Sequence, residues 1–310
     1  MNELELIRQL TQSLPRNDTV VTGPGDDCAV LDLGVPDRLV LFKTDAVVEG
    51  IHFTRDAAPA QVGHKALARC LSDIAAMAGT PTAAVVTLGL PKDFELSFVT
   101  ALYDGMNALA RRHDVAIVGG ETTTNPERVF LSIALLGTVA KDKCIHRSGS
   151  KTGDAIFVTG ELGGSLAGRH LDFEPRLAEA RWLAGQFNIH AMIDLSDGLA
   201  GDLRHLLDAA SVGAELLKTA IPVSRAAKVQ AKAESSTKPP LLAALTDGED
   251  FELLFTVAAR DAVKLADGWR AQFPGVKLSC IGKITAAPGL RLRDARGVHD
   301  FTGHGYVHFS

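Results

Sequence analysis

The alternation of apolar and polar residues predicts helices and strands throughout the first half of the chain. Apolar residues recur at the spacing of an amphipathic helix over residues 3–14, 61–78 and about 95–113. Shorter apolar runs with the composition of strands lie at residues 39–44, 83–90, 115–119 and 129–139. The elements do not follow a strict strand–helix–strand rhythm, so the pattern predicts the α+β class.

A polar run at residues 141–154 separates this half from a second set of elements. The second set is expected to begin with a strand at 155–160 and a glycine-rich turn that runs into a helix at 161–170. A strand, an acidic turn and a helix are expected over 191–210, followed by a surface loop at 231–240. The remaining predicted elements are a strand at 251–257, a helix at 259–272, a strand at 277–284 and a short β-like tail ending at 310. We therefore expect two domains, residues 1–140 and 141–310.

Composition and charge exclude several classes of protein. The 310 residues are 46% hydrophobic and 22% charged, which is typical of a folded globular protein rather than a disordered one. The net charge of −5 disfavours binding to nucleic acid and to anionic membrane surfaces. The longest apolar stretch, Val129 to Ala140, is too short to span a bilayer.

The cysteines and the first residues indicate a cytoplasmic protein. Glu3 and Glu5 lie where a signal peptide would carry basic residues. The four cysteines are far apart and form no C-x-x-C pair, so we expect free thiols in a reducing compartment rather than zinc ligands or disulfides.

Acidic residues recur beside glycines and at strand ends in the first half. Asp26 and Asp27 follow two glycines, and Asp45 follows Thr44 where a buried strand is expected to end. Either group can be ordinary turn chemistry, although loops at strand ends are also where rigid scaffolds carry functional sites. Asp73 lies in an otherwise apolar helix, where a carboxylate needs a partner, either Arg69 one turn earlier or a metal ion.

Three further acidic segments complete the pattern. Glu121 follows the pair Gly119-Gly120, which can close a turn or let a nucleotide approach the backbone. In the segment 191–203, Ser196 or Asp197 can be a helix N-cap, and Asp194 with Ser196 shares one side of the strand. The third segment places Glu249, Asp250 and Glu252 at the start of an apolar strand.

Scattered carboxylates without histidine or cysteine clusters suit Mg²⁺ better than zinc. Magnesium sites of this kind are usually completed by substrate phosphates, so the pattern favours a Mg²⁺-nucleotide enzyme. The chain contains neither the G-x-x-x-x-G-K-[ST] phosphate loop nor the H-R-D and D-F-G motifs of protein kinases. The DLSDG segment lacks the later ligands of an EF-hand loop.

Eight segments in order resemble the thiamine-monophosphate kinases, within the superfamily of aminoimidazole-ribotide and selenophosphate synthetases. They are GPGDDCAV, KTDAVVEGIHF, LSDIAAMAGTP, VGGETT, HRSGSKTGDAIFVTGELGGSLAG, IDLSDGLAGDL, DGEDFELLF and GYVHF, and together they span nearly the whole chain. The resemblance implies a two-domain, aminoimidazole-ribotide-synthetase-like fold: an N-terminal mixed sheet domain that binds ATP and Mg²⁺ and pairs in a homodimer, and a C-terminal α/β domain that completes the active site. It also implies transfer of a phosphoryl group from ATP to thiamine monophosphate, giving thiamine diphosphate, with several Mg²⁺ ions.

The resemblance also implies roles for individual residues. The implied metal ligands are Asp27, Thr44, Asp45, Asp73, Glu121, Asp194 and Asp197. The implied nucleotide contacts are Gly120, Glu121, Arg147 and Ser196, and the implied thiamine phosphate contacts are His52, Glu249 and Tyr306. Asp45, Asp73, Arg147 and Asp197 are the residues expected to act in catalysis. The substrate phosphate is largely ionised at neutral pH and needs no strong general base, so alignment and charge neutralisation suffice.

Four positions depart from the family pattern. Glu121 stands where Asp is usual, Lys43 where Ser is frequent, Asp247 where Gly is common and Gly164 where Asp is frequent. A Lys43 side chain that points inward would supply part of a metal ion's charge. These departures keep two alternatives open: a non-catalytic paralogue that binds nucleotide or thiamine phosphate, and a related ATP-dependent synthetase acting on another small substrate.

Overall fold

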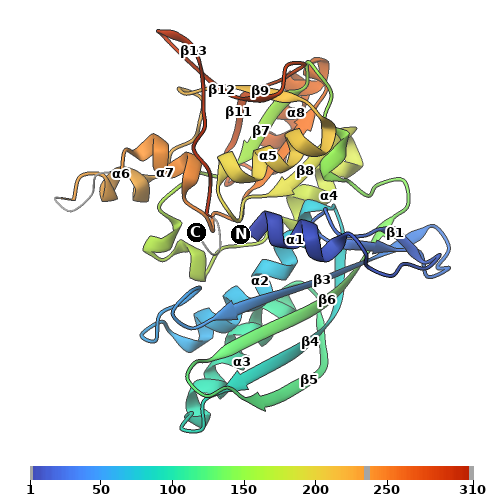
Figure 1. Ribbon diagram of the computed structural model, residues 1–310, viewed down its shortest axis with the longest axis vertical. Coiled ribbons are helices and arrows are strands. Elements are labelled where there is room, and N and C mark those ends of the chain that lie inside the picture. The colour runs from blue at the N-terminus through green and yellow to red at the C-terminus, as the bar shows by residue number, and fades with distance from the viewer. Residues whose placement is uncertain (1–2, 234–237, 307–310) are drawn as a thin grey trace.

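The protein folds around two sheets. The structure, a computed structural model, describes residues 3–233 and 238–306 (Figure 1). The first sheet has the strand order β1-β2-β3-β6-β4-β5, and only the pair β4–β5 is parallel. Its strands are β1 (Val20–Thr22), β2 (Ala29–Leu31), β3 (Arg38–Val48), β4 (Thr80–Leu90), β5 (Ala116–Thr124) and β6 (Phe130–Ala140).

The second sheet is built from the other half of the chain. Its order is β13-β12-β9-β11-β7-β10-β8, with β12–β9 as the parallel pair. The strands are β7 (Ala155–Thr159), β8 (Ile189–Asp194), β9 (Gly213–Leu217), β10 (Leu253–Val257), β11 (Leu278–Thr285), β12 (Gly289–Asp294) and β13 (Gly297–Asp300). Two mixed sheets with intervening helices confirm the α+β prediction.

Helices pack on both sheets. The α-helices are α1 (Glu3–Thr11), α2 (Pro59–Ala76), α3 (Leu96–Arg112), α4 (Leu177–Gln186), α5 (Leu199–Ala210), α6 (Arg225–Gln230), α7 (Pro240–Thr246) and α8 (Ala262–Gln272). Short 3₁₀ turns lie at Arg147–Gly149, Ser165–Ala167, Arg169–Leu171 and Ala259–Asp261. None of the described helices has the length and hydropathy that crossing a bilayer requires.

Helix α2 determines where the site forms. It contacts α3, β3 and β6 on the N-terminal side, and α4 and β8 on the C-terminal side. Thirteen of its 18 residues are buried, including Leu67, Leu71 and Ile74. Buried positions run round most of this helix, because elements of both halves of the chain pack against it. Its polar residues are therefore held at the boundary between the two sheets.

The prediction of a helix after the glycine-rich turn is wrong. Gly164 and Gly168 adopt φ angles of +71° and +133°, and the chain forms two 3₁₀ turns there instead. The predictions for 39–44 and 115–119 stopped short of the ends of β3 and β5. The short elements β1, β2, β9, α4, α6 and α7 were not predicted. In the expected β-like tail, β12 and β13 are strands and 301–306 has no regular structure, while 307–310 lie outside the described residues.

Candidate active site

Three buried carboxylates from separate elements converge at the boundary between the sheets. Asp27 lies in the loop between β1 and β2, Asp73 on α2 and Asp194 at the end of β8. One oxygen of each lies within 4.8 Å of the others. We call this group the carboxylate cluster. The buried Oδ2 atom of Asp27 accepts no hydrogen bond, which leaves a hard oxygen ligand without a partner.

Two cations and a hydroxyl surround the carboxylate cluster. Arg147 donates to Asp27 at 2.6 Å, Lys43 lies 2.9 Å from Asp73, and the Ser72 hydroxyl donates to Asp194 at 2.6 Å. Burial raises the pKa of Asp73 well above its usual value despite the Lys43 ammonium. Burial and the neighbouring Asp27 raise the pKa of Asp194 to about 7. Such carboxylates are stabilised by additional positive charge, and oxygen donors of this kind fit Mg²⁺.

Asp45 lies near the carboxylate cluster and is paired with Arg69. Arg69 donates to its two carboxylate oxygens at 3.1 and 3.3 Å. Burial raises the pKa of Asp45, but Arg69 and Lys43 outweigh that effect and lower it. The suggested pairing of Arg69 with Asp73 is wrong, because Lys43 reaches Asp73 from the facing strand β3.

A pocket of about 110 Å³ lies beside these groups. Five residues expected at the site line it: His52, Ser196, Asp197, Glu249 and Tyr306. The remaining lining residues are Ile51, Arg69, Leu166, Gly248 and Phe251. Arg69 therefore links the pocket to Asp45, and the segment after β8 links it to the carboxylate cluster.

Glu249 is held in the pocket wall by a network that sequence reasoning missed. Its carboxylate contacts Lys65, the His170 ring at 2.9 Å and Arg69 at 3.4 Å. Lys65 is fully buried and also donates to the His52 carbonyl at 2.6 Å. Burial raises the pKa of Glu249, but the His170 hydrogen bond and the Lys65 charge outweigh it and lower the pKa to about 2. Glu249 is thus a fixed, ionised group.

The His52 ring is neutral at physiological pH. Burial and the Arg69 charge lower its pKa to about 4. Its Nδ1 accepts a hydrogen bond from the Val48 backbone N–H at 3.1 Å, so the proton of the neutral ring lies on Nε2.

Tyr306 reaches the pocket because the segment after β13 returns toward the region between the two sheets (Figure 1). Arg204 donates to the carbonyls of Phe301 and Gly303, each at 2.6 Å. The Tyr306 backbone N–H donates to the Asp197 carbonyl at 2.8 Å. These hydrogen bonds, together with that of the Phe301 backbone N–H to the Leu290 carbonyl at 2.8 Å, hold the segment in position.

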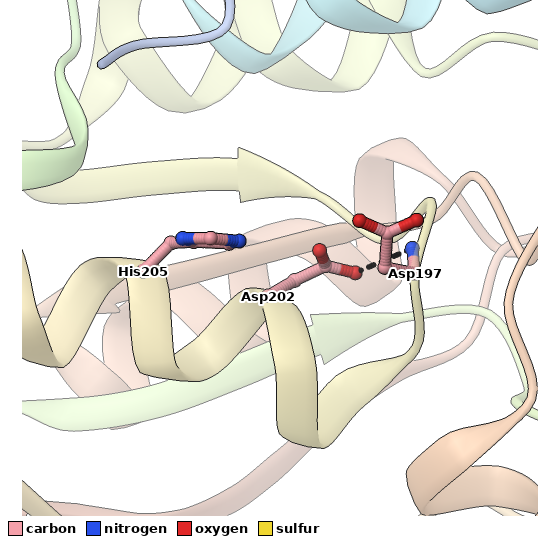
Figure 2. Close-up of side chains that lie close together, drawn as sticks. All are labelled: Asp197, Asp202 and His205. Carbon is pink, nitrogen blue, oxygen red and sulfur yellow. Dashed lines mark hydrogen bonds between the residues drawn. The ribbon is translucent and has the colours of Figure 1, made fainter. Parts of the chain in front are cut away.

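Asp197 belongs to a second group with Asp202 and His205, shown in Figure 2. Asp202 is buried, burial raises its pKa, and it accepts a hydrogen bond from the Asp197 backbone N–H at 3.0 Å. The helix that follows begins at Leu199 with Gly198 as its N-cap, so neither Ser196 nor Asp197 caps it. Asp202 instead orients the turn that carries Asp197. Asp202 could have been found in the sequence, since it is the acidic residue of the first turn of a predicted helix.

Thr44, Gly120 and Glu121 are not brought to the carboxylate cluster. Lys43 and Asp45 lie on the helix-covered face of β3, so Thr44 points to the opposite face, where its hydroxyl lies 3.3 Å from that of Ser132. Glu121 lies on the edge strand β5, where it pairs with Thr87 of β4. Strand β5 is three strands away from β3 in the sheet, a separation of about 14 Å between the two strands.

Gly120 has a packing reason to be glycine. It lies within β5 and not in a turn, and a Cβ atom there would lie 1.8 Å from the Val86 carbonyl oxygen. The close approach of neighbouring backbones excludes a side chain, whether or not a nucleotide binds nearby.

The fold and the site define a member of the AIR synthase-related proteins. Residues 25–139 match the family model "AIR synthase related protein, N-terminal domain", and residues 136–295 match its C-terminal counterpart. The hydrogenase maturation protein HypE of E. coli shares the fold at 20% identity and a TM-score of 0.73, over 96% of both chains.

Curated relatives with a named activity show to which family within this group the chain belongs. The thiamine-monophosphate kinase of Rhodopirellula baltica is 39% identical over 98% of this chain and 96% of its own, and that of Escherichia coli K12 is 36% identical over 94% and 93%. The structure of AaThiL complexed with AMPPCP and TMP superimposes with a TM-score of 0.83 at 28% identity, covering 99% and 97% of the chains. The chain belongs to the thiamine-monophosphate kinase family, and it is an enzyme, a kinase.

Two departures from the family pattern contact each other. The Gly164 backbone N–H donates to the Asp247 carboxylate at 3.0 Å. The two positions are thus neighbours in space, although 83 positions separate them along the chain.

Proposed function

We propose that this protein transfers the γ-phosphoryl group of ATP to thiamine monophosphate with Mg²⁺, giving thiamine diphosphate and ADP. The observation that carries the proposal is that the pocket lined by His52, Glu249 and Tyr306 is joined to the carboxylate cluster by the chain itself. Two further lining residues, Ser196 and Asp197, follow Asp194 of the cluster by two and three positions. The family membership and the complex of AaThiL with AMPPCP and TMP support the same pair of substrates.

The proposed reaction is a direct in-line transfer. A phosphate oxygen of thiamine monophosphate forms a bond with the γ-phosphorus of ATP, and the bond from that phosphorus to the bridging oxygen of ADP breaks. The nucleophile needs no strong base, because the second pKa of such a phosphate is about 6. The protein therefore acts by alignment and by neutralising charge in a site with restricted access to water.

We assign the metal role to Asp27, Asp73 and Asp194, with Asp45 and Asp197 at the edge of the group. Bound Mg²⁺ would neutralise phosphate charge and orient the phosphates for transfer. The unpartnered Oδ2 of Asp27 and the burial of all three carboxylates support this assignment. Arg147, which donates to Asp27 at 2.6 Å, would contact the nucleotide phosphates.

In the pocket, Tyr306 supplies an aromatic wall and Ser196 a hydroxyl. Glu249 and His52 provide fixed polar groups that face thiamine phosphate. Because Lys65 and Arg69 already compensate the Glu249 charge, Glu249 orients the substrate more than it attracts it.

We also propose a homodimer formed by the N-terminal sheet. Helices cover one face of this sheet, and the other face exposes Phe42, Val85, Val118 and Leu136 at 45%, 41%, 66% and 41%. Phe42 and Leu136 are cross-strand neighbours, so the patch is contiguous there. Thr44 and Glu121 lie on this open face, and their nucleotide and metal roles therefore depend on a second copy. We also propose that the boundary between the two domains lies between residues 140 and 141.

The test is release of ADP from ATP by the purified protein, with and without Mg²⁺ and thiamine monophosphate. Asp27→Asn should lower kcat about a hundredfold or more, since it removes charge from the unpartnered ligand position. The matched control is Asp142→Asn, an exposed carboxylate in the connecting run, which should keep the full rate. Binding of thiamine monophosphate without ADP release would instead support the non-catalytic paralogue, and absence of both would point to another small substrate.

A further inference from the structure

Lys43 brings a positive charge into the carboxylate cluster from the neighbouring sheet. It lies on β3 between Leu41 and Asp45, on the face covered by α2. Its Nζ lies 2.9 Å from Oδ1 of Asp73, with side-chain exposures of only 23% and 9%. The ammonium is thus held against one of the three carboxylates that we assign to metal binding.

A cation already contacts each of two members of the carboxylate cluster. Arg147 donates to Oδ1 of Asp27 at 2.6 Å, while the buried Oδ2 of the same carboxylate accepts no hydrogen bond. Oδ1 of Asp73 contacts the Lys43 ammonium. A divalent cation can therefore use the unpartnered oxygen of Asp27, whereas on Oδ1 of Asp73 it would have to share the oxygen with Lys43.

A second ion on Oδ1 of Asp73 would lie close to the ammonium. Mg²⁺ binds oxygen at about 2.1 Å, so such an ion would lie at most about 5 Å from Nζ of Lys43. Like charges at this separation in a buried site repel each other strongly, since little water screens them.

We propose that the Lys43 ammonium takes the place of one divalent cation, so that the carboxylate cluster binds one ion fewer than it would with a neutral residue at position 43. This inference rests on the proposed metal role of the cluster. It assigns Lys43 as a positioning residue that determines how many ions the site holds, a role that does not require contact with either substrate.

The experiment counts ions directly. The full chain, without nucleotide, is titrated with Mn²⁺ as the probe, and bound ions are counted by calorimetry and by the paramagnetic signal of free Mn²⁺. Lys43→Met and Lys43→Ser should each bind one Mn²⁺ more per chain than the unmodified protein. Lys43→Arg keeps the charge and should bind the unmodified number.

A matched control removes a lysine charge elsewhere. Lys218 pairs with Asp294 at 2.6 Å on the C-terminal sheet, so Lys218→Met should leave the number of ions unchanged. Equal Mn²⁺ counts in the unmodified protein, Lys43→Met and Lys43→Ser overturn the proposal. Because the count does not depend on turnover, failure of the kinase assay and failure of this proposal are distinguishable.

Discussion

At the scale of single residues, the pocket combines backbone strain with dense charge pairing. Glu249 and Phe251 adopt φ angles of +63° and +50°, a region that is unfavourable for residues with a Cβ atom. The contacts of Glu249 with Lys65, His170 and Arg69 oppose that cost. Strain that is held by surrounding contacts is typical of functional sites, and here it directs the Glu249 carboxylate to its partners.

The ionised Glu249 should make stability depend on pH in the acid range. Its pKa is about 2 in the folded protein against an ordinary value of 4.5. The group therefore stabilises the fold fully above pH 4.5, by about 3 kcal/mol, and this contribution is lost as the pH falls from 4.5 toward 2. Urea unfolding of the unmodified protein and Glu249→Gln should show a stability difference at pH 6 that shrinks toward pH 3. A difference that stays constant over this range would contradict the assignment.

At the scale of elements, the contact between α2 and α3 depends on two glycines. A Cβ atom on Gly63 would lie 1.8 Å from the Leu102 carbonyl oxygen, and one on Gly105 would lie 1.8 Å from that of Ala60. The two helices therefore approach more closely than helices with side chains at the crossing. This close contact fixes α2, and with it Arg69, Ser72 and Asp73.

Gly105→Ala should lower the free energy of unfolding by about 3 kcal/mol, because the added methyl group forces the helices apart. The matched control is Gly185→Ala on the exposed side of α4, where a Cβ atom meets nothing within 4 Å. That change should stabilise the protein by up to about 1 kcal/mol through helix propensity. Chemical denaturation of both variants measures the difference, and equal effects would refute the packing argument.

The tail that carries Tyr306 is a second element with a defined anchor. Arg204→Met removes the donors to the Phe301 and Gly303 carbonyls, so the tail should lose its fixed position. We expect KM for thiamine monophosphate to rise about tenfold with a smaller change in kcat, since binding is affected more than transfer. Arg293→Met, which breaks a pair with Glu215 on the C-terminal sheet, should leave KM unchanged. An unaltered KM in Arg204→Met would remove Tyr306 from the substrate site.

At the scale of the whole molecule, the N-terminal sheet is covered on one face only. An exposed apolar face of this kind is stable in water when a second copy covers it. Such a dimer would bring two copies of the open face together, including Thr44 and Glu121 from each chain.

The open face can be tested through the oligomeric state. Light scattering of the unmodified protein should give about twice the chain mass of 32.8 kDa. Leu136→Glu places a charge in the centre of the open face and should give the single-chain mass. Val263→Glu, on the exposed side of α8, should leave the mass unchanged. A monomeric unmodified protein would refute the proposed dimer.

The site residues could be predicted to different degrees. Five residues matched by family motifs line one pocket: His52, Ser196, Asp197, Glu249 and Tyr306. The motifs carry no signal for the partners of these residues. Lys65 and His170 are 105 positions apart and contact each other, a proximity that local patterns do not encode.

Sequence by itself determined the fold class and the long elements such as α2, α3 and β6, because hydrophobic periodicity and turn residues are properties of neighbouring positions. It also determined which segments carry carboxylates. Tertiary structure alone decided which carboxylates converge, which of them are paired with arginines and which polar residues lie on the open face. The physical reason is that packing of α2 between the two sheets sets the distances between residues far apart along the chain.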